Sequence, residues 1–365
     1  MNIQDSQFYI YGASHYGQVL AAYLLEKGLK PRAILDKSPK FNDYMGIPCH
    51  AFPNDKLDKC FPVIISILGY AGVEKSLLES GFDQIVSTLD SFDLFPAALK
   101  RLNKCGVLWM QPSSDLVDES KCAKVLSLLS DQQSRDTYNL LVNYRVSPCR
   151  DNYPLPEQYE MYFPDDIPKL YKYEKMRVLD IGAYDGDTLA GFFQRYAQTI
   201  NHYAAVEVST KNIKLLESRL KAMGDATEYV SIYRKAVGLP ENKKLLVKEN
   251  LSATYVSVIE EGEVANVSED CLVESINLSE LTAMTQCNVI KMDIEGADYD
   301  ALVQCRDYIA ECTPTLALSL YHRSEDLWEI PLLIESFAAN RYHYYVRQEG
   351  HWLLETQFYA VPKDK

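Results

Sequence analysis

Three short segments of this sequence place acidic side chains at the ends of apolar runs. They are Val178-Leu-Asp-Ile-Gly-Ala-Tyr-Asp-Gly-Asp-Thr188, Ala204-Ala-Val-Glu207 and Val289-Ile-Lys-Met-Asp-Ile-Glu-Gly296. Carboxylates accept hydrogen bonds from hydroxyl groups and attract cations. Each apolar run has the length and composition of a buried β-strand. The carboxyl ends of parallel strands share one edge of the sheet, which is where open α/β folds bind ligands.

The first segment predicts a strand, a glycine-bearing turn and the start of a helix. Gly182 and Gly186 allow the backbone to approach a ligand closely. The spacing is not the G-x-G-x-x-G of a dinucleotide site, and the loop acids Asp180, Asp185 and Asp187 would repel a pyrophosphate. They suit a ligand with an ammonium and a sulfonium, such as S-adenosylmethionine. The alternative is an ordinary strand–turn–helix of any α/β fold.

Glu207 and Asp293 extend this pattern. Glu207 follows the glycine loop by about 20 residues, where an acid accepts hydrogen bonds from both ribose hydroxyls in nucleotide-binding folds. Asp293 and Glu295 end the third segment. A single acid at a strand end is usually a helix cap or a solvated turn. Three such ends in this order favour a ligand site.

These stretches together resemble the FkbM family of S-adenosylmethionine-dependent methyltransferases. The resemblance covers roughly residues 160–362 and includes Pro314 through His322, Asp326-Leu-Trp-Glu-Ile-Pro-Leu332 and Glu355-Thr-Gln-Phe-Tyr-Ala-Val-Pro362. Relatives often carry an Asp in the Leu-Asp pair before the third segment, whereas this chain has Leu278-Ser279. We assign no role to an acid at that position.

The resemblance implies methyl transfer, usually to a hydroxyl of a sugar or a secondary metabolite. The residues expected to bind S-adenosylmethionine are Asp180, Gly182, Ala183, Tyr184, Asp185, Gly186, Thr188, Glu207 and Asp293. An alcohol attacks poorly unless a base takes its proton. The leading candidate for that base is His322, which follows an expected strand over residues 316–320 and has an ordinary pKa near neutrality.

Asp293 and Glu295 are the rival catalytic residues. The two carboxylates could also hold a divalent metal that acidifies a substrate hydroxyl. No third oxygen ligand at a useful spacing is evident, so we expect no metal. For His322 the alternative is a surface histidine with no part in the chemistry.

A second glycine-bearing turn lies near the N-terminus, in Tyr11-Gly-Ala-Ser-His-Tyr-Gly17. It follows a strand and opens a helix, which is the context of a phosphate site, with Gly12, Ser14 and Gly17 at the motif positions. Asp36 ends the next strand, near the place of a ribose-binding acid. Residues 8–90 are similar to the nucleotide-sugar-binding domain that precedes some sugar acyltransferases. We expect this site to hold a phosphate of the acceptor; the alternative is a degenerate fold with an empty pocket.

The elements that must position these residues alternate between strand and helix. We expect a small Rossmann-like domain over residues 1–110, a helical connector and linker over 111–170, and a class I methyltransferase domain over 171–365. The fold class is α/β throughout. Residues 342–346 and 357–361 should form the last two strands, and the sheet should be mostly parallel with an antiparallel strand over 357–361. Residues 245–276 should form a hairpin or cover near the site.

The net charge and the cysteine content limit which binding partners and which cellular compartment we expect. The net charge of -14 argues against nucleic acid, which needs a basic face. Nine cysteines without a C-x-x-C pair indicate a reducing compartment, and we expect a cytoplasmic protein without a secretory signal or membrane insertion. The expected acceptor is a small molecule or a glycan, and a homo-oligomer is possible. Two other functions stay open: a bifunctional chain with a nicotinamide-dependent reductase in its first domain, and a non-catalytic nucleotide- or nucleotide-sugar-binding protein that keeps the methyltransferase fold.

Overall fold

The computed structural model describes residues 7–69, 72–104, 117–239, 244–250, 253–258 and 268–363. These residues divide into two compact units. The smaller unit comprises residues 1–117, 139–155 and 350–353, and the larger unit comprises 118–138, 156–349 and 354–365. The expected connector, residues 111–170, is thus distributed over both units. Each unit is described by itself below.

The smaller unit is built on a six-stranded sheet in the order β3-β4-β2-β1-β5-β6. All neighbouring strands pair in parallel except β3 and β4. The expected strands near residues 9, 33 and 63 are confirmed as β1, β2 and β5. The elements are β1 (Tyr9–Tyr11), α1 (His15–Glu26), β2 (Ala33–Asp36), β3 (Asp43–Tyr44), β4 (Ile47–Ala51), β5 (Val63–Ile65), α2 (Val73–Glu79), β6 (Ile85–Val86), α3 (Thr88–Leu94) and α4 (Pro96–Lys104).

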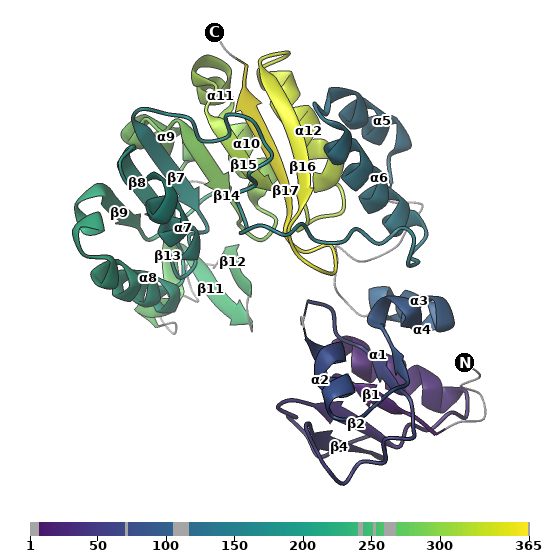
Figure 1. Cartoon of the computed structure of the whole chain (residues 1–365). Helices are drawn as coiled ribbons and strands as arrows, with labels where there is room; N and C mark the ends of the chain where they lie inside the picture. The colour runs from purple at the N-terminus through teal and green to yellow at the C-terminus, as the bar shows by residue number, and fades with distance from the viewer. Residues whose placement is uncertain are drawn as a thin grey trace. The chain divides into compact units, whose positions relative to one another are not determined.

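Two helices occupy the region expected to be helical over residues 113–145. They are α5 (Glu119–Leu128) and α6 (Gln132–Val146), and residues 113–116 lie outside the described residues. Asp118 caps α5 by accepting a hydrogen bond from the Lys121 amide, and Leu129 ends the helix in an extended conformation. Figure 1 shows α5 beside α12 in the larger unit.

The larger unit contains a seven-stranded sheet in the order β16-β17-β15-β14-β7-β8-β9. Strands β15, β14, β7, β8 and β9 are parallel, and β17 is antiparallel to both β15 and β16, as the sequence predicts. The elements of this sheet and its crossovers are β7 (Met176–Ile181), α7 (Asp187–Tyr196), β8 (Ile200–Val206), α8 (Thr210–Met223), β9 (Val230–Tyr233), α9 (Leu278–Thr285), β14 (Val289–Met292), α10 (Asp298–Gln304), α11 (Arg306–Cys312), β15 (Thr315–Ser319), α12 (Asp326–Phe337), β16 (Tyr342–Gln348) and β17 (Thr356–Pro362).

A four-stranded sheet in the order β10-β13-β11-β12 lies between β9 and α9 in the sequence. Strands β11 (Lys244–Asn250) and β12 (Ala253–Val258) are antiparallel, and β11 also pairs with β13 (Leu272–Ser275), which runs beside β10 (Lys235–Ala236). The expected hairpin is therefore confirmed. Its place over the functional site stays a prediction.

Buried apolar side chains hold the larger unit together on the sheet. Val178, Tyr203, Val289 and Ala317, from four neighbouring strands, are fully buried in one cluster with Phe192 of α7. Burying side chains of this size contributes roughly 1.5–3 kcal/mol each. The packed sheet makes the strand ends a rigid edge on which side chains keep their places.

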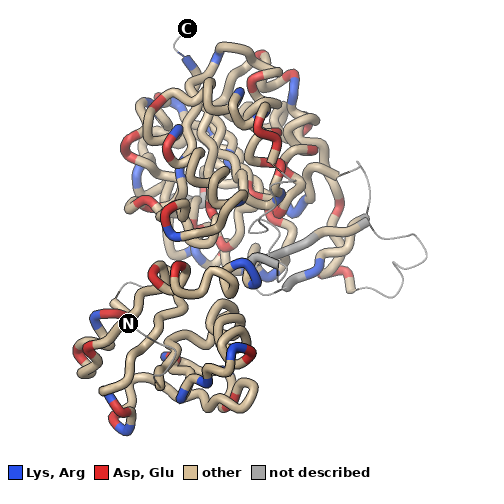
Figure 2. Tube along the Cα trace, turned by 90° about the vertical axis from the view of Figure 1, so that its right-hand side faces the viewer, with Lys and Arg blue, Asp and Glu red and all other residues tan. Residues whose placement is uncertain are grey.

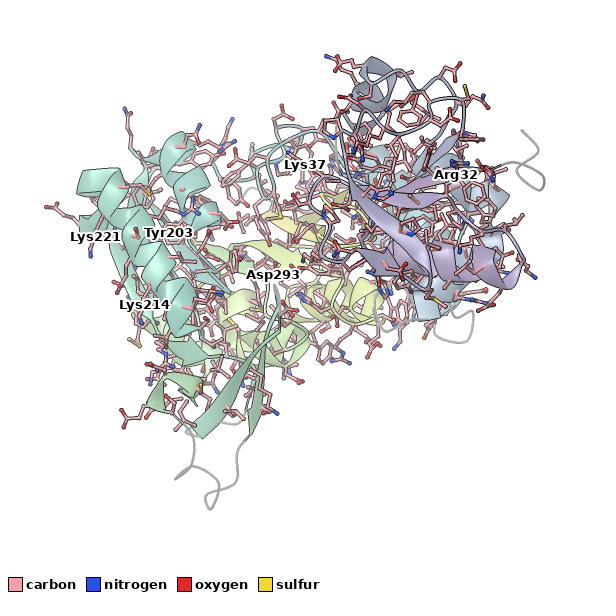
Figure 3. The ribbon with its side chains drawn as sticks, turned by 90° about the horizontal axis from the view of Figure 1, so that it is seen from below. Arg32, Lys37, Tyr203, Lys214, Lys221 and Asp293 are labelled. Carbon is pink, nitrogen blue, oxygen red and sulfur yellow. The ribbon has the colours of Figure 1, made fainter. Side chains whose placement is uncertain are left out.

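Charged positions of both signs are interspersed along the chain (Figure 2). Lys214 and Lys221 are both exposed on α8, and Figure 3 shows them apart from Asp293. Among the helices in the described ranges, none combines the length and the apolar character needed to span a bilayer.

Candidate functional site

The strand order of the larger sheet reverses direction between β7 and β14. From β7 the chain adds β8 and β9 on one side, and later adds β14 and β15 on the other. Loops leaving β7 and β14 therefore diverge at their carboxyl ends, and in open α/β folds that is where a ligand binds. The acids that the sequence singled out lie at or near this edge.

The loop after β7 is anchored to both neighbouring strands. The amides of Gly182 and Ala183 donate to the carbonyl oxygen of Val206, at 2.9 and 3.0 Å. Gly182 has φ +80°, and a Cβ there would lie 1.9 Å from the carbonyl oxygen of Asp293. Only glycine allows this approach, which brings the loop against the end of β14.

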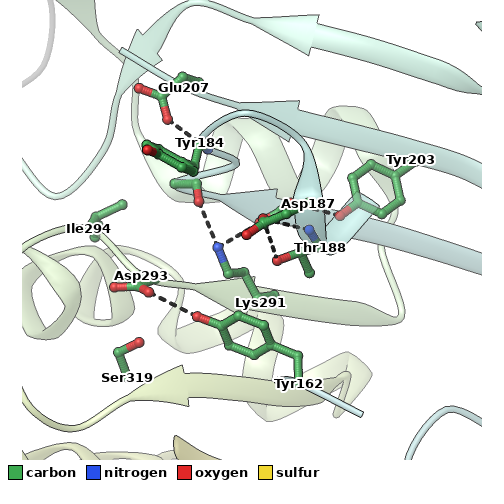
Figure 4. A network of polar contacts seen from close by, with 12 residues as sticks. Tyr162, Tyr184, Asp187, Thr188, Tyr203, Glu207, Lys291, Asp293, Ile294 and Ser319 are labelled. Carbon is green, nitrogen blue, oxygen red and sulfur yellow. Dashed lines mark hydrogen bonds and ion pairs between the residues drawn. The ribbon is translucent and has the colours of Figure 1, made fainter. Parts of the chain in front are cut away.

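Asp180 lies inside β7 and not after it. It is fully buried, accepts a 2.7 Å hydrogen bond from the Tyr203 hydroxyl, and lies 3.0 Å from the Lys291 ammonium. Lys291 is its register partner on β14 and donates to the carbonyl oxygen of Gly182 at 2.6 Å. Burial disfavours the Lys291 charge, but Asp180 outweighs it and raises the lysine pKa. Asp180 therefore acts on the loop through Lys291, which Figure 4 shows between the β7 loop and Tyr162.

The other loop acids also have partners within the chain. Asp185 forms a 2.7 Å ion pair with Arg219 of α8. Asp187 begins α7, where a negative charge favours the helix N-terminus, and accepts from the Thr188 amide at 2.6 Å. Gly186 precedes it with φ +82°. Asp185 and Asp187 are thus bound to groups of the protein itself.

Glu207 links the β7 loop to the end of β8. Its Oε2 accepts from the Tyr184 amide at 2.9 Å, and its Oε1 accepts from the amides of Val208 and Ser209 at 3.0 and 2.8 Å. The side chain is buried, and burial raises its pKa despite these donors. Tyr184 next to it is half exposed, with φ +48°. A left-handed conformation at a tyrosine is strained, and such strain gathers at ligand sites.

Asp293 is the centre of the polar cluster at the end of β14. Its Oδ2 accepts a 2.9 Å hydrogen bond from the Tyr162 hydroxyl (Figure 4). Its Oδ1 accepts a 3.2 Å hydrogen bond from the Tyr321 hydroxyl. Burial would raise the pKa of Asp293, but His322 and Lys291 lower it below its usual range. Asp293 is therefore a fixed negative charge at the edge of the sheet.

His322 lies between two carboxylates. Its Nε2 is 3.1 Å from Oδ1 of Asp293 and its Nδ1 is 3.3 Å from Oδ2 of Asp298, in directions that depart from ideal hydrogen bonds, so the attraction is between charges. Burial opposes protonation, yet the two acids hold the pKa of His322 well above its ordinary value. Glu295, with φ +55°, lies 3.7 Å from Nε2 and stays partly accessible. The two acids therefore favour the protonated, imidazolium form of His322.

The N-terminal turn has the backbone of a close strand–helix junction. A Cβ on Gly17 would lie 1.9 Å from the carbonyl oxygen of Gly12, so glycine is required for α1 to pack on the turn. Asp36 accepts from the amides of Ala13 and Ser38, both at 2.8 Å. Ser14 precedes α1 without a side-chain capping bond. The structure brings these four motif residues together, and their role in ligand binding stays a prediction.

No group of three or more His, Cys, Asp or Glu side chains in the described ranges has an arrangement that could hold a metal ion. The Asp293 and Glu295 pair is therefore considered below as part of the cluster with His322.

Several residues of this cluster were missed by the sequence interpretation. Tyr162 lies between α6 and β7, Asp298 in α10, Asp326 in α12 and Glu355 just before β17. Lys291 gave a usable signal, because a lysine in the middle of an apolar strand must find a charged partner when buried. Asp326 and Glu355 lie in stretches that carry the family resemblance but had no role assigned to them, and Tyr162 and Asp298 carry no local pattern that marks them.

Comparisons with known proteins agree with this architecture. Residues 180–349 match the family model described as the methyltransferase FkbM domain. The crystal structure of methyltransferase FkbM from Methylobacillus flagellatus is similar with a TM-score of 0.65 and 19% sequence identity, over 97% of this chain and 90% of that one. At that identity the likeness concerns the fold.

The methyltransferase domain of bacterial CtHen1-C has a TM-score of 0.29 and 14% identity, over 52% of this chain and 91% of that one, and supports no argument here. A search of curated proteins gave no match.

Proposed function

We propose that this chain, whose residues 180–349 match the methyltransferase FkbM domain, transfers a methyl group from S-adenosylmethionine to a hydroxyl oxygen. The acceptor class is a sugar, a glycan precursor or a small metabolite. The observation that carries the proposal is the acidic edge formed by Glu207, Asp293 and Glu295 at the reversal of the strand order.

The residues at this edge fit S-adenosylmethionine. Glu207 can accept from ribose hydroxyls, because its Oε2 makes one hydrogen bond to the chain and a carboxylate oxygen can accept more. Asp293 and Glu295 offer negative charge to an ammonium or a sulfonium. The Lys291 ammonium is buried in an ion pair with Asp180, so it is not available to bind the phosphate of a dinucleotide. When bound, S-adenosylmethionine supplies a methyl group on a positively charged sulfur.

The chain's own residues would orient the two reactants. Gly182 fixes the loop against β14, Tyr162 and Tyr321 hold the Asp293 carboxylate, and Asp298 holds His322. Alignment of two reactants can lower a barrier by ~7–11 kcal/mol in favourable cases. What remains for catalysis is to take one proton from the acceptor hydroxyl.

The test is a calorimetric titration of the full chain with S-adenosylmethionine, followed by labelled-methyl transfer to a panel of nucleotide sugars, glycans and small hydroxylated metabolites. We expect saturable binding of S-adenosylmethionine and label in an alkali-stable ether. Binding of NAD or NADP in its place would support the reductase. Binding of none of these would support a non-catalytic module.

A further inference from the structure

His322 is poorly suited to take the acceptor proton. An imidazolium between Asp293 and Asp298 already carries the proton that a base would have to accept. Asp293 is held by two tyrosine hydroxyls and by the charge of His322, which makes it a weak base. Glu295 and Glu355 are the other carboxylates beside this cluster, and one of them must serve if the acceptor is a hydroxyl.

We propose that the carboxylate of Glu355 is the base that takes the proton from the acceptor hydroxyl, with His322 as a fixed positive charge beside it. The inference rests on the proposed function and assigns one catalytic residue to it.

The sheet register places Glu355 beside this cluster. Ser319 is opposite Gln357, and the Leu320 amide donates to the carbonyl oxygen of Thr356 at 2.9 Å. Continued past the last paired residues, this antiparallel register would bring Glu355 opposite Tyr321, whose hydroxyl contacts Asp293 and whose pKa the Glu355 charge raises. The Glu355 backbone has φ +56° and is held by a 2.9 Å hydrogen bond from the Glu349 amide to its carbonyl oxygen. A strained conformation kept by a backbone bond presents this side chain to the edge.

One oxygen of the Glu355 carboxyl makes no hydrogen bond within the described residues. This oxygen, Oε2, is shielded from solvent. Glu349, six residues earlier, contrasts with it, because its oxygens accept from the Tyr359 hydroxyl and the Tyr162 amide. A buried, unpaired carboxyl oxygen costs free energy in the protein alone and gains a partner when a hydroxyl binds.

The surroundings of Glu355 set its proton affinity. The groups that face it are Lys291 on β14, Asp293 after β14, His322 and Tyr321 after β15, Glu349 after β16, and Tyr162. Burial, and then the Asp293 charge, raise the pKa of Glu355 to about 8, while His322 and Lys291 act in the opposite direction. A base is most effective when its pKa is near the working pH.

The proposed step balances in atoms and charge. The acceptor oxygen forms a bond to the methyl carbon as the carbon–sulfur bond breaks, and the electron pair of that bond stays on sulfur. The hydroxyl proton passes to Oε2 of Glu355. The products are a methyl ether, a neutral thioether and a protonated carboxyl, which returns its proton to solvent before the next turnover.

The experiment compares the wild type with Glu355→Gln and Glu355→Asp in the full chain. Gln keeps the shape but cannot take the proton, so kcat should fall by ~10²-fold or more. The wild-type rate should rise as the pH passes through about 8, where the carboxylate forms, and this rise should be absent in Glu355→Gln. Glu355→Asp should keep the rise with a lower rate.

Two further measurements separate chemistry from folding. Affinity for S-adenosylmethionine and the thermal midpoint should be close to wild type in Glu355→Gln. An infrared difference spectrum, wild type minus Glu355→Gln, should show a protonated carboxyl at neutral pH that disappears as the pH passes about 8. The matched control is Glu335→Gln. Glu335 lies on α12, and its carboxylate accepts a hydrogen bond from the Tyr344 hydroxyl.

The outcomes distinguish the two proposals. If the wild type binds no S-adenosylmethionine or methylates no hydroxyl, the proposed function fails and the role of Glu355 with it. If the wild type methylates a hydroxyl and Glu355→Gln does so equally fast with the same pH profile, the role of Glu355 alone is wrong.

Discussion

At the residue scale, the site is a set of opposite charges buried together. His322 neutralises Asp293 and Asp298, and Lys291 neutralises Asp180. Isolated buried charges are costly, so each partner depends on the other. On our proposal His322, the histidine that the sequence offered as a base, serves as a fixed cation; its part in catalysis stays a prediction.

Replacing His322 by Gln should destabilise the protein. Asp298 is fully buried and would lose its cation, so the free energy of unfolding should fall by about 3–5 kcal/mol. Urea unfolding followed by circular dichroism measures this loss. The double variant with Asp298→Asn should recover part of it, because the stranded charge is removed. If His322→Gln is as stable as the wild type, His322 does not stabilise the buried charge of Asp298.

Glu207 allows a direct test of cofactor binding. Glu207→Ala should weaken affinity for S-adenosylmethionine by about 1–3 kcal/mol, since ribose hydroxyls and loop amides lose an acceptor. Calorimetry of the full chain measures the change. Glu217→Ala is the matched control, because Glu217 is exposed on α8. Unchanged affinity in Glu207→Ala would contradict the assignment of Glu207 to the ribose.

At the element scale, the site depends on how closely the β7 loop approaches the end of β14. Gly182 makes the approach possible, and Lys291 ties the loop carbonyl to β14. The loop is therefore positioned by the strand next to it as well as by its own sequence. A change in the contact between these two elements should disturb the site without altering any group that meets a ligand.

Gly182→Ala should move the β7 loop away from the end of β14. The new Cβ would meet the Asp293 carbonyl oxygen at 1.9 Å, which backbone movement must relieve at a cost of about 1–3 kcal/mol. Gly224→Ala is the control, because Gly224 also has positive φ, +67°, but nothing within 4 Å of the added Cβ. Both variants carry backbone strain, and only Gly182→Ala should also lose affinity for S-adenosylmethionine. Equal behaviour of the two would contradict the argument.

At the scale of the whole molecule, the two units exchange segments of chain. Residues 118–138 belong to the larger unit and 139–155 to the smaller one, although they share helix α6. The tip of the β16–β17 hairpin, residues 350–353, belongs to the smaller unit, where Trp352 packs against Tyr16 and Phe92 at ring-centroid distances of 5.6 Å. Neither unit can be isolated by one cut.

This organisation predicts how fragments behave. Arg347 is buried and pairs with Asp131 at 2.7 Å and with Asp166 at 2.8 Å. A fragment of residues 150–365 lacks Asp131, whereas 118–365 keeps it. The shorter fragment should be less stable by about 3–5 kcal/mol or fail to unfold cooperatively. Urea unfolding of both fragments measures this, and equal stability would show that residues 118–149 are dispensable. The proposed phosphate site of the smaller unit is better tested by point variants.

The sequence by itself determined the strands and turns that create the site. Alternation of strands and helices, Gly182 and Gly186 after one strand, and acids at 207 and 293 after others are local patterns, and they are sufficient to predict an acidic edge on a parallel sheet. The antiparallel C-terminal strands were also predictable from their composition. The role of single residues was not, because it depends on partners distant in sequence.

Only the tertiary structure decided which strand lies beside which. Asp180 meets Lys291 because β7 and β14 are neighbours in that register, and Glu355 comes near Asp293 and His322 because β17 pairs with β15. Asp298 reaches His322 across more than 20 positions of chain. A side chain's charge state follows from burial and from its nearest charges, and neither is a property of local sequence. For that reason the sequence located the edge, and the fold determined which of its acids can accept a proton.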